Sequence, residues 1–430
     1  MTTMTTNPPR SLREVSCADD YDPNSMPVAK ARELIASFLA PVTAVERVHV
    51  RSALGRVLAA DIVSPIAVPG HDNSAMDGYA VRFADLDPAK ETLLKRVGES
   101  FAGKPWHGSI GRGECVRIFT GGVMPQGADT VVMQERASED GHGVRLAAGA
   151  VAKAGTNRRF AGEDLKEGQI VFRAGQRVRP AELGMIASLG IGEVSVYRKL
   201  RVAFFSTGDE LKSIGTPLGP GEIYDSNRYT LHGMLLRLGC ETIDMGVVED
   251  APKKLERAFA AAAEAADVVI TSGGVSVGEA DYVKQLLDKL GEVLFWKIAM
   301  KPGRPLAYGK IGAAHFFGLP GNPVSVMVTF YEFVRDALLT LQGQREIQPL
   351  PTFKVALSAP IRKAPGRTEF QRGILSADGR GGWTVRTTGD QGSGILSSMS
   401  QANCFIVLPS ETGNVAAGEL VDVQLLEGLI

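Results

Sequence analysis

The sequence predicts a multidomain protein of α/β-plus-β class, with a central doubly wound parallel α/β domain. Between residues 200 and 346, strand-like runs alternate with helical runs, which is the signature of a parallel sheet covered by helices. Short strand-like runs separated by turns fill residues 72–160 and 347–430, as in small β domains. The chain has 430 residues, too many for one ordinary core, so we expect about three or four domains.

The remaining segments complete this division of the chain. Residues 1–26 are polar, contain prolines and lack periodicity, which predicts a disordered tail. Apolar residues recur at helical spacing from Val28 until Pro41, and PAELGMIASLG at 180–190 predicts a second helix. The predicted domains are a tail at 1–26, an elongated α+β domain at 27–71 with 161–199, an inserted β domain at 72–160, the α/β domain at 200–346 and a C-terminal β barrel at 347–430.

Loops leave the ends of the strand-like runs in the α/β region. Ligands bind outside the carboxyl ends of the strands in a parallel sheet, so these loops should converge whatever the ligand is. Four of the five loops are rich in Gly, Pro, Ser, Asp or Glu: TGDE, SGGVSVGEAD, KPGRP and LPGNPVS. The fifth is the short acidic loop ED, which ends in Asp250.

Glycines and hydroxyls dominate the loop TSGGVSVGEAD. Gly273, Gly274 and Gly278 allow the backbone to approach a ligand closely, and bare N–H groups before a helix favour anions. Ser272 and Ser276 add hydroxyl donors suited to phosphate or ribose. Such loops also occur in α/β proteins as plain tight turns, so one loop alone leaves both interpretations open.

Charged residues in the neighbouring loops indicate a phosphate-bearing ligand with a divalent ion. Lys301 and Arg304, in KPGRP, supply positive charge at a rigid turn. Asp250 and Asp281 offer the carboxylate oxygens that Mg²⁺ prefers. An Asp before a helix is also often a cap. The turn and cap interpretations explain each loop but not the clustering of charge, which favours a ligand site.

Composition and motifs argue against several other classes. The 47 Lys and Arg residues nearly balance the 48 Asp and Glu residues, which disfavours a nucleic-acid or anionic-membrane partner. No apolar run approaches the roughly 18 residues that span a bilayer, and the N-terminus lacks the layout of a signal peptide. The four cysteines are scattered, so we expect neither a disulfide framework nor a zinc site. The absence of a disulfide framework favours a cytoplasmic protein. The sequence lacks the motif GxxxxGK[ST], which disfavours a P-loop enzyme, and the motif GxGxxG, which disfavours a nicotinamide dehydrogenase. It also lacks a histidine-based catalytic motif, which disfavours a Ser-His-Asp hydrolase.

A set of motifs resembles the molybdopterin molybdenumtransferase family, which is MoeA-like and related to the C-terminal domain of gephyrin. The resemblance spans about residues 27–430, with the motifs in the expected order. The motifs are PGHDNSAMDGYAV, RIFTGGVMPQGADTVVMQE, AGEDL, FSTGDEL, IYDSN, TSGGVSVGEADY, MKPGRP, GLPGNPVS and PGRTEFQRG.

The resemblance implies a substrate that fits these loops, adenylylated molybdopterin. The enzyme would hydrolyse the phosphoanhydride with the help of Mg²⁺, release AMP and ligate molybdate to the dithiolene, giving molybdenum cofactor. The fold that the resemblance implies has a molybdopterin-binding α/β domain, and its elongated domain forms a dimer. The sister family that adenylylates molybdopterin typically has Thr-Gly after the glycine pair, where this chain has Val275 and Ser276. That difference favours the insertion step.

Individual roles follow from the resemblance. Asp250 and Asp281 would position Mg²⁺ or polarise the anhydride, and Glu210 would orient the ion or an attacking water. The implied catalytic residues are Asp77, Glu210, Asp250, Asp281 and Lys301, and the metal ligands are Asp250, Asp281 and Glu210. The predicted substrate-binding residues are Thr207, Gly208, Asp225, Ser272, Gly273, Gly274, Ser276, Gly278, Lys297, Arg304, Pro320, Asn322 and, for the molybdate oxyanion, Arg367 with Ser393 or Ser397.

Asp77, in SAMDGYA, lies far from the α/β region in sequence. It resembles a family aspartate that acts at the active site of the partner subunit, which implies a homodimer with shared active sites. Asp-Gly is also a common hairpin pair, so a plain turn is the alternative interpretation.

Three alternatives to molybdate insertion stay open at the level of sequence. The chain would adenylylate molybdopterin, insert tungstate, or act as a non-enzymatic scaffold. The four carboxylates Asp77, Glu210, Asp250 and Asp281 favour catalysis over scaffolding, because a scaffold does not need them. The adenylylating enzyme and apo-molybdoenzymes are the further partners that the resemblance suggests.

Overall fold

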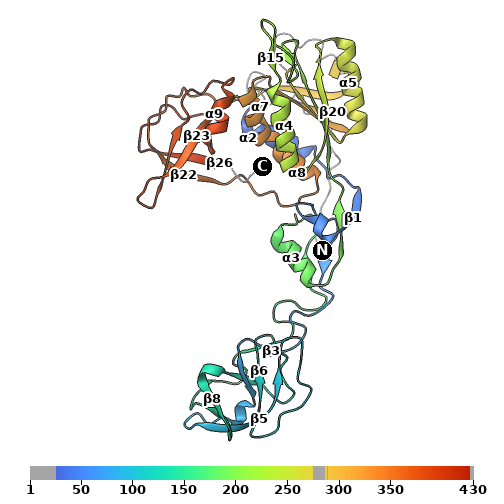
Figure 1. The fold of residues 1–430 in the computed structure, drawn as a ribbon. Helices are drawn as coiled ribbons and strands as arrows, with labels where there is room; N and C mark the ends of the chain where they lie inside the picture. The colour runs from blue at the N-terminus through green and yellow to red at the C-terminus, as the bar shows by residue number, and fades with distance from the viewer. Residues whose placement is uncertain (1–25, 275–285, 288, 427–430) are drawn as a thin grey trace, which may run out of the picture.

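The computed structural model describes residues 26–274, 286–287 and 289–426. Figure 1 shows an extended molecule. An α/β sheet and a barrel lie side by side, and a long arm carries a separate β sheet away from both. The predicted tail, apart from Met26, lies outside the described residues. Met26, which we expected in the tail, is buried and pairs through its backbone with Lys297 and Ala299.

The first part of the arm combines segments from both sides of the inserted domain. Strand β1 pairs with β12 in antiparallel fashion, and helix α3 packs beside them over a small apolar core. Proline at the first position of α3 is favourable because its missing N–H has no helical partner there. The bounds are α2 Val28–Ser37, β1 Val45–His49, a 3-10 turn at Val50–Ala53, β2 Ile62–Val63 paired with β11 Ile170–Phe172, α3 Pro180–Ser188 and β12 Glu193–Tyr197.

The inserted β domain lies at the far end of the arm (Figure 1). Its sheet has the strand order β7-β4-β6-β5-β9-β8, and β3 pairs with β10 where the chain enters and leaves. These strands lie inside the expected range 72–160, although the domain boundaries themselves stay a prediction. The bounds are β3 Asn73–Ser74, β4 Gly78–Val81, β5 Thr92–Ser100, β6 Glu114–Ile118, β7 Thr130–Met133, β8 Ala137–Asp140, β9 Gly143–Leu146 and β10 Arg158–Arg159, with 3-10 turns at Phe83–Asp85 and Gln134–Arg136.

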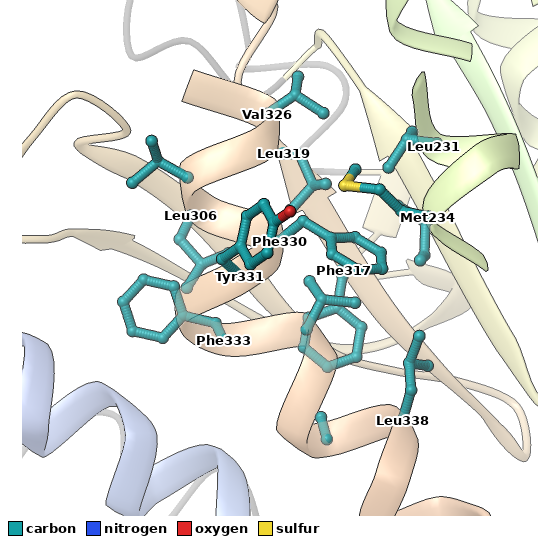
Figure 2. Close-up of a cluster of buried hydrophobic side chains, with 14 of the residues drawn as sticks. Leu231, Met234, Leu306, Phe317, Leu319, Val326, Phe330, Tyr331, Phe333 and Leu338 are labelled. Carbon is teal, nitrogen blue, oxygen red and sulfur yellow. The ribbon is translucent and has the colours of Figure 1, made fainter. Parts of the chain in front are cut away.

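The α/β sheet has the strand order β16-β13-β17-β21-β20-β18. Alternate residues of β13 face opposite layers: Phe204 packs with α4, whereas Phe205 packs with Phe259 of α5. Figure 2 shows Leu231 and Met234 of α4 beside Phe317 of β21. The bounds are β13 Arg201–Thr207, α4 Ser226–Arg237, β16 Glu241–Val248, α5 Pro252–Ala265, β17 Val268–Ser272, β18 Gly291–Lys297, β20 Pro305–Ile311, β21 Ala314–Leu319, α7 Pro323–Thr329, a π-helical turn Phe330–Val334 and α8 Arg335–Leu341, with a small pair β14 Leu211–Lys212 and β15 Ile223–Tyr224.

One strand corrects the expectation of an all-parallel sheet. Strands β16, β13, β17 and β21 are parallel, but β20 is antiparallel to both β21 and β18. Only Gly312 and Ala313 separate β20 from β21, and so short a connection permits a hairpin but no crossover. Two reversals leave β18 running in the same direction as β21. The loop after Lys297 therefore still leaves the sheet at the carboxyl edge, as predicted.

The C-terminal β barrel is confirmed. Its strands follow the order β23-β24-β22-β26-β25, and pairing of β23 with β25 closes the barrel. Strand β19 of the KPGRP segment adds to the barrel by pairing with β23. The bounds are β19 Met300–Lys301, β22 Thr352–Leu357, β23 Thr368–Ala377, β24 Trp383–Thr387, α9 Leu396–Gln401, β25 Cys404–Leu408 and β26 Leu420–Leu425. No helix among the described residues is long and apolar enough to cross a membrane.

An ion pair fixes the arm to the α/β sheet. Arg198, just after β12, contacts both oxygens of Asp267 at 2.9 and 2.8 Å, and the Arg201 N–H donates to Asp267 Oδ2 at 2.8 Å. Burial opposes ionisation of Asp267, but the hydrogen bond from Arg198 and then that from Arg201 outweigh it and hold the pKa of this carboxyl below its usual value. The pair therefore stabilises the fold fully above the ordinary Asp pKa, and loses its effect as the pH falls through the lower folded-state value.

We expect Asp267→Asn to lower the free energy of unfolding by about 2 kcal/mol near pH 7, because it leaves Arg198 without its counter-charge. The difference from wild type should shrink as the pH falls below about 4, where the wild-type carboxyl also takes up a proton. Urea unfolding followed across that pH range measures both. Stability curves that stay parallel down to low pH would contradict the assignment.

Candidate functional site

A cavity of about 900 Å³ opens at the carboxyl edge of the α/β sheet. Loops after β13, β16, β17 and β21 line it, together with the start of α4 and a segment of the barrel. The convergence expected from strand topology is therefore present. Its lining includes these predicted site residues: Thr207, Gly208, Glu210, Asp225, Asp250, Ser272, Gly273, Gly274, Pro320 and Asn322.

Asp250 is held at the end of β16 by the neighbouring strand. The hydroxyl of Thr207, the last residue of β13, donates to Asp250 Oδ1. The Asp250 N–H donates to Asp209 Oδ1 at 3.4 Å. Glu210 lies in the same loop and folds back onto Gly208, where a Cβ would lie 2.6 Å from Glu210 Oε2. Three carboxylates, those of Asp209, Glu210 and Asp250, thus line one cavity.

Gly273 and Gly274 bring backbone close to β13, whereas the sequence suggested a close approach to a ligand, which stays a prediction. Both have positive φ, 90° and 69°. A Cβ on Gly273 would lie 2.4 Å from the Thr207 carbonyl oxygen, and one on Gly274 would lie 2.9 Å from Thr207 Cγ2. The glycines are therefore required by packing as well as by conformation.

Gly273→Ala should destabilise the protein by roughly 2 kcal/mol or more, since the new methyl group meets backbone in a strained conformation. The substitution should also distort the cavity, because β17 and β13 must separate there. Gly233→Ala is the matched control: it lies on the exposed face of α4 with nothing near its Cβ position. That change should stabilise the helix slightly, and equal losses in urea unfolding for both variants would refute the packing argument.

Asp225 and Asn227 organise the cavity from the start of α4. Asp225 caps the helix through Oδ1, which accepts from the Arg228 N–H at 3.2 Å and the Ser206 hydroxyl at 3.0 Å. Asn227 Nδ2 donates at 2.7 Å to both Ser272 Oγ and the Gly321 carbonyl. One amide therefore ties three loops together. An Asp before a helix is a common cap, whereas the bridging contacts of Asn227 depend on the fold.

The basic loop Lys297–Arg304 lies beside the cavity, but Lys297, Lys301 and Arg304 are not among its lining residues. Lys301 Nζ is 3.6 Å from Glu369 Oε1 on the barrel. The loop is closed by a hydrogen bond from the Ile298 N–H to the Arg304 carbonyl, and Pro305 brings it to the cavity wall. The binding roles of the three basic residues remain predictions.

The barrel reaches the cavity through the segment before α9. Gly394 and Leu396 line the cavity, and the Ser393 carbonyl accepts from the Val324 N–H of α7 at 3.1 Å. Ser397, on α9, and Arg367 are exposed and do not line it. Ser393 does not line the cavity either, so the choice between Ser393 and Ser397 stays a prediction.

Sequence reasoning missed Arg372. This arginine is 1 % exposed, and its guanidinium donates to Ser398 Oγ and to the Gly392 carbonyl, each at 2.9 Å. It thereby fixes both ends of the barrel segment that reaches the cavity. A charged residue inside the strand FQRG was the available signal, but nothing in the sequence indicated its partners.

Asp77 lies between β3 and β4 of the inserted domain, which Figure 1 shows at the far end of the arm, and it does not line the cavity. Its Oδ1 accepts from the N–H and the hydroxyl of Thr120, each at 2.8 Å, and these bonds hold the pKa of Asp77 below its usual value. The aspartate is therefore a fixed, ionised group in a turn. No role for it within its own cavity is geometrically available.

The magnesium site predicted from Asp250, Asp281 and Glu210 is described only in part. Asp250 and Glu210 line the cavity, whereas Asp281, Ser276 and Gly278 lie outside the described residues. Within the described part of the chain, no group of three or more His, Cys, Asp or Glu side chains is placed to hold a metal ion.

Fold and site together define a class: a multidomain protein whose α/β sheet presents a glycine- and carboxylate-rich cavity, bordered by a barrel and joined to a long arm. Family models match nearly the whole chain in the same order. They are the MoeA N-terminal region (domain I and II) at residues 26–190, a probable molybdopterin binding domain at 203–340 and the MoeA C-terminal region (domain IV) at 354–426. The chain belongs to the MoeA family, which confirms the resemblance seen in the motifs.

Individual relatives agree with this result. A molybdopterin molybdenumtransferase of Haemophilus influenzae is 46% identical over 93% of this chain and 98% of its own length. One from Nostoc is 37% identical, covering 89% of this chain and 88% of its own. The crystal structure of a molybdopterin biosynthesis MoeA protein from Pyrococcus horikoshii matches with a TM-score of 0.80 and 30% identity, covering 94% of this chain and 100% of that one.

Proposed function

We propose that this chain is a molybdopterin molybdenumtransferase, an enzyme that inserts molybdenum into molybdopterin to give molybdenum cofactor. The observation that carries the proposal is the cavity in which Asp250 and Glu210 face the glycine loop Gly273–Gly274. This combination suits a ligand that bears phosphates, because glycines let the backbone approach a ligand closely and a cation held by carboxylates balances the negative charge of phosphates. The two relatives named above carry this activity in their names.

The substrate that we propose is adenylylated molybdopterin, with molybdate as the second substrate. A water molecule attacks the phosphorus of the AMP half, the bond from that phosphorus to the bridging oxygen breaks, and AMP leaves. The pterin phosphate keeps the bridging oxygen. Glu210 lies at the cavity wall, where a carboxylate can orient the attacking water and take its proton.

We propose Mg²⁺ as the accompanying ion. Asp209, Glu210 and Asp250 line the cavity and offer the oxygen donors that hard cations prefer. Among the described residues these carboxylates do not form a metal site by themselves, so the ion needs a further ligand. Asp250 would hold the ion, with Glu210 and Asp281 as further ligands. When bound, the ion would neutralise charge on the phosphates. The Thr207 hydroxyl keeps Asp250 in place by donating a hydrogen bond to Asp250 Oδ1.

Molybdate would bind on the barrel side of the cavity, near the Lys297–Arg304 loop and Ser393. Lys301 and Glu369 join this loop to the barrel. We further propose that the enzyme is a homodimer in which Asp77 reaches the cavity of the partner subunit, since Asp77 lies far from its own.

The test is AMP release from adenylylated molybdopterin in the presence of Mg²⁺, with and without molybdate. We expect release that depends on molybdate. Adenylylation of free molybdopterin with ATP would instead identify the sister activity, and the absence of both reactions would identify a scaffold. Substitution of tungstate at equal concentration compares the two oxyanions directly.

A further inference from the structure

A buried carboxylate lies between helices α7 and α8. Glu332 belongs to the π-helical turn Phe330–Val334 and is 2 % exposed. A buried charge is costly unless it is paired, and π-helical turns are uncommon and often occur at functional sites. The cavity already described does not include Glu332.

The partners of Glu332 come from opposite ends of the chain. Arg32, on α2, donates through Nη2 to Glu332 Oε2 and through Nε to the Glu332 carbonyl at 2.9 Å. Gln424, on the last strand β26, donates to Glu332 Oε1 at 2.9 Å. One side chain therefore joins α2, the α/β domain and the barrel. Figure 1 shows α2 and α7 between the barrel and the sheet.

The elements joined by Glu332 also hold the parts of the site that border the barrel. Just before α2, Met26 forms backbone hydrogen bonds with Lys297 and Ala299 at 2.7 Å, at the start of the basic loop. The barrel pairs with the same loop through Met300 and Thr368. At the other end, α7 binds the Ser393 carbonyl. A shift of the barrel relative to α7 therefore moves the basic loop and the Ser393 segment together.

We propose that Glu332 is a positioning residue that sets the placement of the barrel and the basic loop against the cavity, and so controls use of molybdate. This inference rests on the proposed function. Within the described residues, the hydrogen bonds of Glu332 named above reach α2 and β26, and not the loop after β13 or Gly273 and Gly274, which we propose for the nucleotide. The effect should therefore fall on molybdate rather than on AMP.

The test compares Glu332→Gln and Arg32→Gln with wild type in the full chain. We expect the KM for molybdate to rise about tenfold or more, because small misplacements of binding groups have effects of that size. The affinity for AMP, measured by calorimetry, and kcat at saturating molybdate should change less than about twofold. Arg32 is partly exposed, so its variant decides the question if Glu332→Gln does not fold. Lys354→Gln removes an exposed barrel ion pair with Asp422 and should change nothing.

A distance measurement separates failure of this inference from failure of the proposed function. Spin labels on Ala261→Cys of α5 and Ala417→Cys of the barrel, both exposed, report their separation, after Cys17→Ser removes a background thiol. The distribution of distances between the two labels should broaden in Glu332→Gln and in Arg32→Gln. This expectation holds even if wild type shows no transferase activity. An unchanged distance distribution in these variants would overturn the inference. A broadened distribution in a variant that is active with a normal KM for molybdate would also overturn it. Equal losses in molybdate and AMP binding would do so as well.

Discussion

Asp250→Ala should lower molybdate-dependent AMP release by about 10²–10³-fold, which is the range seen when one charge-stabilising group is removed from an active site. Asp250 lies at the end of β16 in the cavity, where Thr207 fixes its orientation. Its loss takes away a carboxylate that we propose for Mg²⁺. Steady-state AMP release at several Mg²⁺ concentrations measures the effect, and excess Mg²⁺ should recover only part of it.

Two further variants isolate the charge of Asp250. Asp250→Asn keeps an oxygen that can accept the Thr207 hydroxyl, so it preserves shape while removing charge. Glu241→Gln is the matched control, because Glu241 lies at the opposite end of the same strand and is exposed. Full activity in Asp250→Asn would mean that the charge is not needed, and the magnesium role would be wrong.

Asp77→Ala should abolish AMP release in the homodimer that we propose, although Asp77 belongs to the inserted domain and does not line the cavity of its own chain. A mixture of Asp77→Ala and Asp250→Ala chains should regain about a quarter of wild-type activity. Half of the dimers in such a mixture are hybrids, and each hybrid has one site with both aspartates intact. Activity measured after unfolding and reassembly of the mixed chains tests this directly.

The complementation has a clear opposite outcome. If Asp77 acts within its own chain, mixing cannot restore a complete site and the mixture stays inactive. If Asp77 serves only as a turn, Asp77→Ala alone keeps its activity. Asp140→Asn is a suitable control, since Asp140 is another turn carboxylate of the inserted domain, paired with Arg145. It should leave activity intact in both pure and mixed samples.

Some parts of the site could be predicted from the sequence and others could not. Convergence of Thr207, Asp250, Ser272 and Pro320 was predictable, because the carboxyl ends of parallel strands share one edge of a sheet. The place of the two glycines at this edge was also predictable, but their tight packing against Thr207 of β13 was not. Those inferences depend only on local pattern and on strand topology.

The barrel side of the site was not predictable in the same way. Ser393 and Ser397 are equivalent in sequence, and only the docking of the barrel on α7 distinguishes them. Arg372 and Glu332 are charged residues within apolar segments, and their partners are distant along the chain. The reversal of β20 follows from a two-residue connection, which our division into strand–helix units overlooked.

The central claim is that this chain makes active molybdenum cofactor, and transfer to an apo-molybdoenzyme tests it most directly. Purified protein is incubated with adenylylated molybdopterin, molybdate and Mg²⁺, and the mixture is added to a molybdenum-free apo-enzyme whose activity is then measured. We expect activity that requires molybdate and this protein, and that is lost with Asp250→Ala. Equal reconstitution by molybdate and substrate without the protein, or none with it, would mean that this chain does not make the cofactor.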